Sequence, residues 1–171
     1  ATLALRSKGS GTIVLPIDAS HAFECLADQY GGKVARTRAD PHALMIAAQE
    51  SGVILATDGA GNFIFPEFQP VTDGLMATAK LLEFLATQQE PLSDLVKSLP
   101  EIHIESSRVA CPWQIKGSVM RRLTEIHHTG EIQEGIKLNY DEREWVLIWP
   151  DPDYPHIIIT AESTSVEKLA H

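Results

Sequence analysis

The stretch GVILATDGAGNFIFPEFQPVTDG, residues 52–74, reads as two short strands joined by a tight turn and followed by a helix start. Residues 53–55 form a short apolar run that is typical of a buried strand. Residues 63–65 form a second run, which Pro66 ends because proline has no N–H to donate to a sheet. The second strand is therefore predicted to be antiparallel to the first. The residue types that favour a tight turn between them are Asp58, Gly59 and Gly61.

A helix is predicted to follow this hairpin, since Thr72 or Asp73 is a suitable N-cap. The apolar positions after the cap recur at helical spacing and are predicted to face the core. These positions are Leu75, Met76, Ala79, Leu82, Leu85 and Ala86. A loop between a strand and a helix start often binds a ligand in α/β proteins. The pattern by itself favours an ordinary turn that leads into a core helix.

Upstream of this stretch, predicted strands alternate with predicted helices. Residues 12–15 and 33–37 are the strand candidates. Ser20 is expected to cap one helix, and Asp40 followed by Pro41 is expected to open another that runs to about residue 50. The alternation predicts right-handed βαβ crossovers and a mostly parallel sheet.

The second half of the chain has a different pattern. A short helix is predicted for residues 91–99, and Ser106 with Ser107 is a plausible domain boundary. Residues 116–126 are predicted to form a helix with Val119, Met120, Leu123 and Ile126 facing inward. Short turns join the strand candidates, so we expect an antiparallel sheet with helices on one face. The strand candidates are residues 136–139, 145–149 and 156–161, and a last helix is expected from Thr164, cut off at His171.

The length, composition and net charge are those of a globular chain, and they exclude some classes of partner. A formal net charge of −9 over 171 residues argues against a nucleic-acid surface, which needs clustered Lys and Arg. No apolar run approaches the length of a membrane span, so no membrane partner is expected. Cys25 and Cys111 read as buried thiols of a reducing compartment, and we expect the cytoplasm. The chain starts at Ala1 without Met, as a piece of a longer protein would.

Composition and spacing alone indicate no reaction. Gly59 and Gly61 lack the third glycine of a dinucleotide fingerprint and lead into a strand instead of a helix. The adjacent His127 and His128 would point apart on a helix, so no metal site is expected. Asp151 and Asp153 belong to a proline-stiffened turn and are interpreted as solvated turn residues, although such carboxylates could contact a hard cation.

A resemblance to a known family suggests a function that composition and spacing do not. GNFIFPEFQPVTDG is similar to a segment of the third domain of the phosphohexomutases, the phosphomannomutase and phosphoglucomutase superfamily, where a GEESGH sugar loop runs into IIFPDF. The likeness extends to nearly the whole chain through two further runs, GGKVARTRADPH and EGIKLNYDEREWVLIWPDPDYPHIIITAES. The resemblance implies a three-layer α/β domain at residues 1–105 with a mixed, mostly parallel four-stranded sheet. It implies a smaller, TBP-like α+β domain with an antiparallel sheet at residues 106–171, corresponding to the fourth domain.

The two ligand loops depart from the family pattern. The resemblance implies a degenerate sugar loop that keeps only the glycine before its last residue, and a degenerate phosphate loop in place of RPSGTEP. Losing a carboxylate and a hydroxyl removes acceptors for sugar hydroxyls. In the phosphate loop, Pro152 has no N–H to give and two aspartates would repel an anion. The sugar-loop residues are Thr57, Asp58, Gly59, Ala60, Gly61 and Asn62, and the phosphate-loop residues are Trp149, Asp151, Pro152, Asp153 and Tyr154.

A narrower resemblance accounts for these departures. The runs ATDGAGNFIFPEFQP, VACPWQIKGSVMRRL and WVLIWPDPDYP look like the mutase-like tail of fused mannose-1-phosphate guanylyltransferases. The full-length protein with such a tail, the parent of this chain, would form a nucleotide sugar, GDP-mannose, and would need Mg²⁺. The part of the parent given by this chain is expected to need no cofactor. The implied role is regulatory, sugar-sensing or assembly, and the chain alone is not expected to be catalytic.

Two other functions stay open. The chain could belong to a working phosphomannomutase or phosphoglucomutase and close over substrate held by other domains, or it could be a scaffold. The expected partners are the N-terminal domains of its own polypeptide, a sugar or sugar phosphate, and further copies of the parent in a homo-oligomer.

Overall fold

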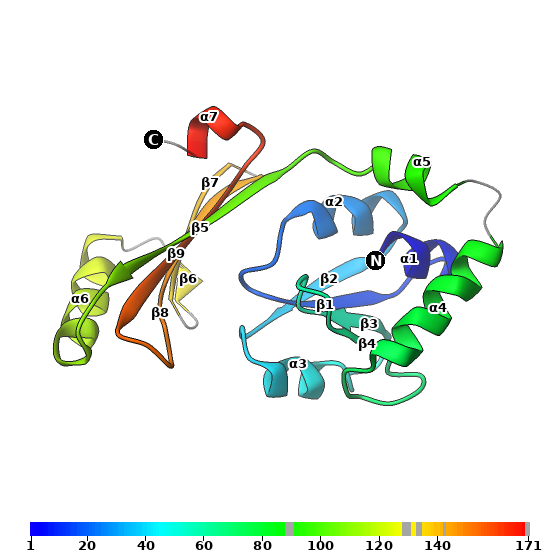
Figure 1. Cartoon of the computed structure of the whole chain (residues 1–171), viewed down its shortest axis with the longest axis horizontal. Helices are drawn as coiled ribbons and strands as arrows, with labels where there is room; N and C mark the ends of the chain where they lie inside the picture. Colours follow the sequence, from blue (N-terminus) through cyan, green and yellow to red (C-terminus); the bar gives the residue numbers. More distant parts are fainter. Residues whose placement is uncertain (88–90, 128–130, 133–134, 142, 170–171) are drawn as a thin grey trace. The chain divides into compact units, whose positions relative to one another are not determined.

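The computed structural model describes residues 1–87, 91–127, 131–132, 135–141 and 143–169. The chain divides into two compact units, Ala1–Pro100 and Glu101–His171 (Figure 1). The division lies before the expected boundary at residues 105 and 106. Strand β5 (His103–Ala110) runs through Ser106 and Ser107, which pair with β9 (His156–Ser163) of the second unit.

The first unit contains the expected mixed, mostly parallel four-stranded sheet, with strand order β2-β1-β3-β4. Three strands are parallel and β4 is antiparallel to β3, with Ala56 opposite Ile64 and Thr57 opposite Phe63. This confirms the hairpin predicted from residues 52–74. The strands are β1 (Thr12–Pro16), β2 (Lys33–Thr37), β3 (Val53–Thr57) and β4 (Phe63–Ile64).

Helices cover both faces of this sheet, which gives three layers (Figure 1). On one face, Leu5 and Ala27 pack with Ile13 in one buried cluster. On the other face, Leu44 and Ala48 of the α3 segment pack with Val14. The helices of this unit are α1 (Thr2–Lys8), α2 (Ala22–Gln29), α3 (Pro41–Ala47), α4 (Gly74–Thr87) and α5 (Leu92–Lys97).

Two of the three predicted caps are present. Ser20 instead precedes the N-cap residue of α2, which is His21, although its hydroxyl accepts from the backbone N–H of Ala22 at 3.0 Å. The Asp40 carboxylate accepts from the backbone N–H of His42, and Pro41 occupies the first turn of α3. Asp73, not Thr72, caps α4 through the backbone N–H of Met76 at 2.9 Å. Each carboxylate satisfies an N–H that has no partner within its own helix.

The predicted inner face of α4 is wrong in part. Leu75 is 86% exposed and Leu82 is 63% exposed, whereas Phe84 is buried against Leu55 and Phe65. The helix is apolar around most of its circumference, so spacing alone did not distinguish the side that meets the sheet. Phe84 occupies the side that faces the core, and Leu75 and Leu82 face outward.

The second unit is an antiparallel sheet with strand order β5-β9-β8-β7-β6. The three predicted strands are present, and residues 103–110 add a long edge strand. Helix α6 begins at Trp113, earlier than predicted, and Ile126 is 57% exposed instead of facing inward. The remaining elements are β6 (Glu131–Ile132), β7 (Ile136–Asp141), β8 (Glu144–Pro150), α6 (Trp113–Ile126) and α7 (Val166–Leu169).

Within the described residues, no helix has the length and apolar character needed to cross a membrane. The two cysteines are free thiols: Cys111 is buried as expected, but Cys25 is only half-buried.

Gly135, immediately before β7, lies against β8 without room for a side chain. A Cβ at Gly135 would collide with the carbonyl oxygen of Ile148 and lie 2.5 Å from Cβ of Trp149. We expect Gly135→Ala to lower the free energy of unfolding by about 2 kcal/mol, because the backbone of β8 would have to move. Urea denaturation measures the change.

The matched control is Gly117→Ala in α6, where an added Cβ meets no atom within 4 Å. That change should stabilise the helix by up to about 1 kcal/mol. Equal effects of the two substitutions would contradict the packing described for Gly135.

Candidate functional site

The carboxyl ends of three parallel strands meet at one edge of the first sheet. Strands β1, β2 and β3 end at Pro16, Thr37 and Thr57. The loops that follow them border a cavity of ≈ 420 Å³. This edge is where open parallel sheets place ligand sites. The polar side chains that line the cavity are Asp18, Asp40, Asp58, Asn62 and Thr72.

The turn after β3 is organised by the carboxylate of Asp58. Its Oδ1 accepts from the backbone N–H of Ala60 at 2.8 Å and from that of Asn62 at 3.1 Å. The side-chain amide of Asn62 donates to the other carboxylate oxygen. Gly59 and Gly61 have φ of 74° and 110°, a region that residues with a Cβ rarely adopt. The turn is therefore closed by its own side chains.

These hydrogen bonds control the ionisation of Asp58. Partial burial raises the pKa of this carboxyl, but the hydrogen bonds from the Asn62 side chain and from the N–H groups of Ala60 and Asn62 outweigh it, and the net pKa is lowered. Asp58 is thus an anion at neutral pH. With Asp18 and Asp40 it gives the cavity three carboxyl groups.

The charge of the cavity decides what it can accept. Among the described residues that line it there is no Lys, Arg or His. Carboxylates accept hydrogen bonds from hydroxyl or ammonium groups and repel phosphate. The cavity is therefore suited to hydroxyl or ammonium donors and not to phosphate.

Arg36 on β2 holds the loop after β1 in place. Its guanidinium donates to the carbonyl oxygens of Pro16 at 2.8 Å, Ala19 at 2.7 Å and Ser20 at 3.0 Å. It also forms a two-pronged ion pair with Glu24 of α2, at 2.8 and 2.7 Å. These bonds use the guanidinium within the fold and fix the backbone on both sides of Asp18.

The structure brings some of the predicted sugar-loop residues together and separates others. Asp58, Ala60 and Asn62 line the acidic cavity. Thr57 is buried, and its hydroxyl accepts from the N–H of Gly59 at 3.3 Å. Gly61 instead lines a separate apolar cavity of ≈ 380 Å³ between α1 and α4, beside Phe63 and Phe84.

Sequence reasoning missed three polar side chains of this cavity, those of Asp18, Asp40 and Thr72. Asp40 was considered only as a helix cap. Asp18 lies two residues beyond the end of β1, so its place after a parallel strand was a usable signal. Thr72 was considered only as a cap, yet it lines the cavity from the segment before α4. The bracing role of Arg36 depends on carbonyl groups far away in sequence, which a local pattern does not reveal.

The predicted phosphate loop lies in the second unit, between β8 and β9. The carboxylate of Asp151 accepts from the backbone N–H of Asp153 at 2.9 Å and from that of Tyr154 at 3.1 Å. Asp151 is 5% exposed, so the interpretation of this residue as a solvated turn aspartate is wrong. The carboxylate closes the loop from inside because its oxygen lies within reach of both N–H groups.

Lys116 of α6 fastens the same loop. Its ammonium donates to the carbonyl oxygens of Asp151 at 2.7 Å and Tyr154 at 2.6 Å, and it lies 3.7 Å from the centre of the Trp113 ring. Hydrogen bonds from the N–H groups of Asp153 and Tyr154, with the nearby Arg108 and Lys116 charges, outweigh desolvation and lower the pKa of Asp151. Trp149, at the position expected for the arginine of the family, precedes this loop on β8.

The part of the chain that the structure describes contains no group of three His, Cys, Asp or Glu residues suited to a metal ion. His127 is the C-cap residue of α6, and its neighbour His128 lies outside the described residues.

Residues 1–103 match the family described as phosphoglucomutase/phosphomannomutase, alpha/beta/alpha domain III. A "Probable phosphoglucosamine mutase" of Methanopyrus kandleri is 30% identical over 168 residues, which cover 96% of this chain and 37% of that protein. A "Phosphoglucomutase/phosphomannomutase" of Thermococcus kodakarensis is 30% identical over 175 residues, covering 98% of this chain and 37% of that protein. The chain thus spans little more than a third of the curated relatives it matches.

The fold agrees with a solved structure. A phosphoglucomutase/phosphomannomutase family protein of Burkholderia thailandensis aligns with a TM-score of 0.78 over 99% of this chain and 38% of that chain, at 19% identity. At 19% identity, this likeness supports the fold alone. Taken with the match over residues 1–103, these likenesses lead to one conclusion: the chain belongs to the phosphoglucomutase/phosphomannomutase family.

Proposed function

We propose that this chain is a sugar-binding module of the phosphohexomutase type that does not itself transfer phosphate. The observation that carries the proposal is the chemistry of its two loops. The loop after β3 offers carboxylates to sugar hydroxyls, whereas the loop between β8 and β9 uses its N–H groups on its own Asp151. The hydroxyl-binding function is thus supported, and phosphate binding in the family's manner is not.

The parent that best suits such a module is a nucleotide-sugar-forming enzyme, specifically a mannose-1-phosphate guanylyltransferase. The support is the sequence resemblance of ATDGAGNFIFPEFQP and WVLIWPDPDYP to the tails of those fused proteins. In that setting the module senses sugar or assists assembly, and any Mg²⁺ belongs to the catalytic domain. Its partners are the other domains of its own polypeptide and, through them, further copies.

A second function is favoured by the relatives themselves. The proteins matched over nearly the whole chain carry the names phosphoglucosamine mutase and phosphoglucomutase/phosphomannomutase. A working mutase would use this chain to close over a hexose phosphate held by other domains. Mutase activity of the full-length parent, lost on substitution of Asp151 or Lys116, would favour this second function over the first.

The first test is a titration of the chain followed by backbone amide NMR. The ligands are mannose 1- and 6-phosphate, the glucose counterparts, glucosamine 6-phosphate and GDP-mannose. We expect shifts at residues 57–62 that saturate in the micromolar to millimolar range. Glucosamine 6-phosphate should bind most tightly, because the cavity offers three carboxyl groups to its ammonium. Absence of shifts with every ligand would exclude sugar sensing by this chain.

Two substitutions make the titration specific. Asp58→Ala should weaken binding about tenfold or more, since a charged acceptor is lost. Asp28→Ala, on the exposed end of α2, should leave binding unchanged. Equal affinities of the two variants would place the ligand elsewhere.

The turn after β3 should respond to acid in a defined range. Because the pKa of Asp58 is lowered from its usual value of 3.8, the turn is fully stabilised above that pH and opens as the pH falls through the lowered pKa. The amide resonances of Ala60 and Asn62 should report a transition below pH 3.8 that Asp58→Asn lacks. A midpoint above 3.8 would contradict the hydrogen bonds described for this carboxylate.

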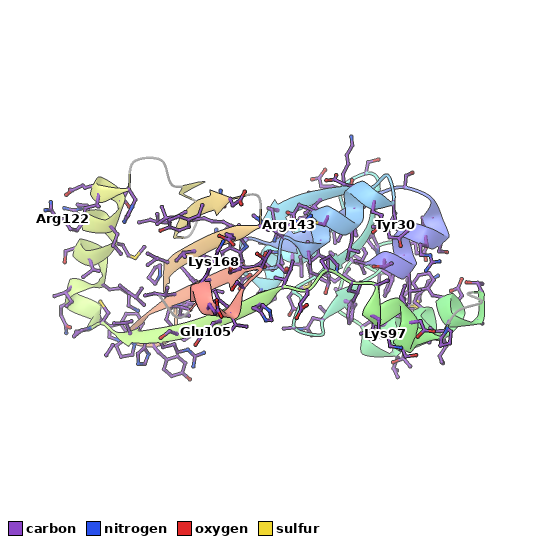
Figure 2. The ribbon with its side chains drawn as sticks, turned by 90° about the horizontal axis from the view of Figure 1, so that it is seen from above. Tyr30, Lys97, Glu105, Arg122, Arg143 and Lys168 are labelled. Carbon is purple, nitrogen blue, oxygen red and sulfur yellow. The ribbon has the colours of Figure 1, made fainter. Side chains whose placement is uncertain are left out.

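Arg36 should position the loop that carries Asp18. Arg36→Met removes the bonds to three carbonyls and to Glu24 and should destabilise the first unit by about 2 kcal/mol. Sugar affinity should fall as well, because the Asp18 loop loosens. The control is Arg122→Met: Arg122 projects from the outer side of α6 (Figure 2), and its ion-pair partner within the part of the chain that the structure describes is Glu125, at 3.3 Å. That change should cost less than about 0.5 kcal/mol. Thermal unfolding and the titration together measure both effects.

A further inference from the structure

The outward side of α4 is apolar. Leu75 is 86% exposed and Leu82 is 63% exposed, and two alanines on the same side of the helix are exposed as well. The four residues follow one another at intervals of four, three and four positions, which places them in one row along a helix. In Figure 1, α4 runs along the outside of the first unit. We call this surface the leucine–alanine stripe, and its residues are Leu75, Ala79, Leu82 and Ala86.

The charged residues of α4 lie beside the stripe and are paired. The helix contains one lysine and one glutamate, and Nζ of Lys80 lies 3.0 Å from the carboxylate of Glu83. The same ammonium lies 2.7 Å from the carboxylate of Glu67, in the segment before the helix. These pairs matter because the chain has a net charge of −9, so two copies repel each other on average. On the stripe, two copies can meet without setting unpaired carboxylates against each other.

The order of large and small residues in the stripe is self-complementary. If two α4 helices pack antiparallel about a two-fold axis between residues 80 and 81, Leu75 lies opposite Ala86 of the second copy. Ala79 then lies opposite Leu82 of the second copy. Each leucine meets an alanine, so the side chains interdigitate and the helices can approach closely. A parallel pair in register would set leucine against leucine and alanine against alanine.

We propose that the leucine–alanine stripe is a self-association surface, on which a second copy of this chain packs its own α4 in the antiparallel direction. The surface gives a location to the assembly role proposed above. It does not depend on sugar binding, because residues 57–62 lie outside the stripe. The sugar titration and the self-association experiment can therefore fail independently of each other.

The size of the surface determines how strong the contact can be. A stable protein–protein interface uses about 20–30 residues from each partner. The stripe with its exposed neighbours Val71, Thr78 and Leu81 is much smaller than this. We therefore expect a weak dimer, with a Kd of about 100 µM. In a parent that already holds its copies close together, the same contact would be strengthened by the high effective concentration.

The test is sedimentation equilibrium of the whole 171-residue chain between about 10 µM and about 1 mM. We expect the weight-average mass to rise with concentration from that of a monomer toward that of a dimer. The rise should begin at a lower concentration in about 0.5 M than in about 0.05 M potassium chloride, because salt screens the repulsion between two negatively charged chains. A wild type that stays monomeric at about 1 mM in both salts would overturn the proposal, and another domain of the parent would then be the occupant to test.

Exchanging a leucine and an alanine across the two-fold axis tests the antiparallel arrangement. Ala79→Leu sets two leucines against each other, and Leu82→Ala leaves a gap, so each change should raise the Kd about tenfold. The double variant again sets a leucine against an alanine, and its Kd should return to within about threefold of the wild type. Tighter association of Ala79→Leu, or a double variant no better than either single one, would contradict the arrangement.

A charge placed in the stripe provides the second test. Leu82→Glu should remove self-association up to about 1 mM, because two carboxylates would enter an apolar contact. The matched control is Ile46→Glu on α3, where Ile46 is 53% exposed and the helix packs on the opposite face of the sheet. The control should associate like the wild type, and both variants should keep the Tm of the wild type within a few degrees, since both positions are exposed. Equal loss of association in the two variants would refute the assignment to α4.

Discussion

Every backbone N–H in a loop needs an acceptor, and in this chain an aspartate meets that requirement in both candidate ligand loops. Asp58 accepts from the N–H groups of Ala60 and Asn62, and Asp151 accepts from those of Asp153 and Tyr154. A loop whose N–H groups donate to water or to a ligand changes its conformation when that partner leaves. These two loops carry their acceptors with them, so their shapes do not depend on a ligand.

The same acceptors determine what each loop can do. At the carboxyl edge of the first sheet, Asp58 lines a cavity with two further aspartates and therefore favours hydroxyl or ammonium donors. In the second unit, the Asp151 carboxylate occupies the donors that an anion would need. The cations near both sites stabilise the fold. Arg36 donates to loop carbonyl oxygens and pairs with Glu24, and Lys116 donates to a loop carbonyl oxygen and contacts the Trp113 ring.

Local chemistry predicted much of the architecture. Strand Lys33–Thr37, the Asp40 cap and the antiparallel return at Phe63 follow from patterns within a few residues. The outward leucines of α4 did not, because a helix that is apolar on several sides gives no local preference for the side that packs on Leu55. Ser106 and Ser107 read as a plausible domain boundary, yet pairing with β9 makes them part of a strand.

The sequence by itself determined most of the strands and helices, the glycine-rich turn with its aspartate, and the proline-stiffened segment WPDPDYP. Residue type and spacing over a few positions are enough for each of these. Only the tertiary structure decided that Asp18 and Thr72 share a cavity with Asp58, and that Lys116 is buried against a loop more than thirty residues away in sequence. Those contacts join segments whose approach depends on sheet order and helix packing, and short-range patterns do not encode which carbonyl or carboxylate a distant cation will meet.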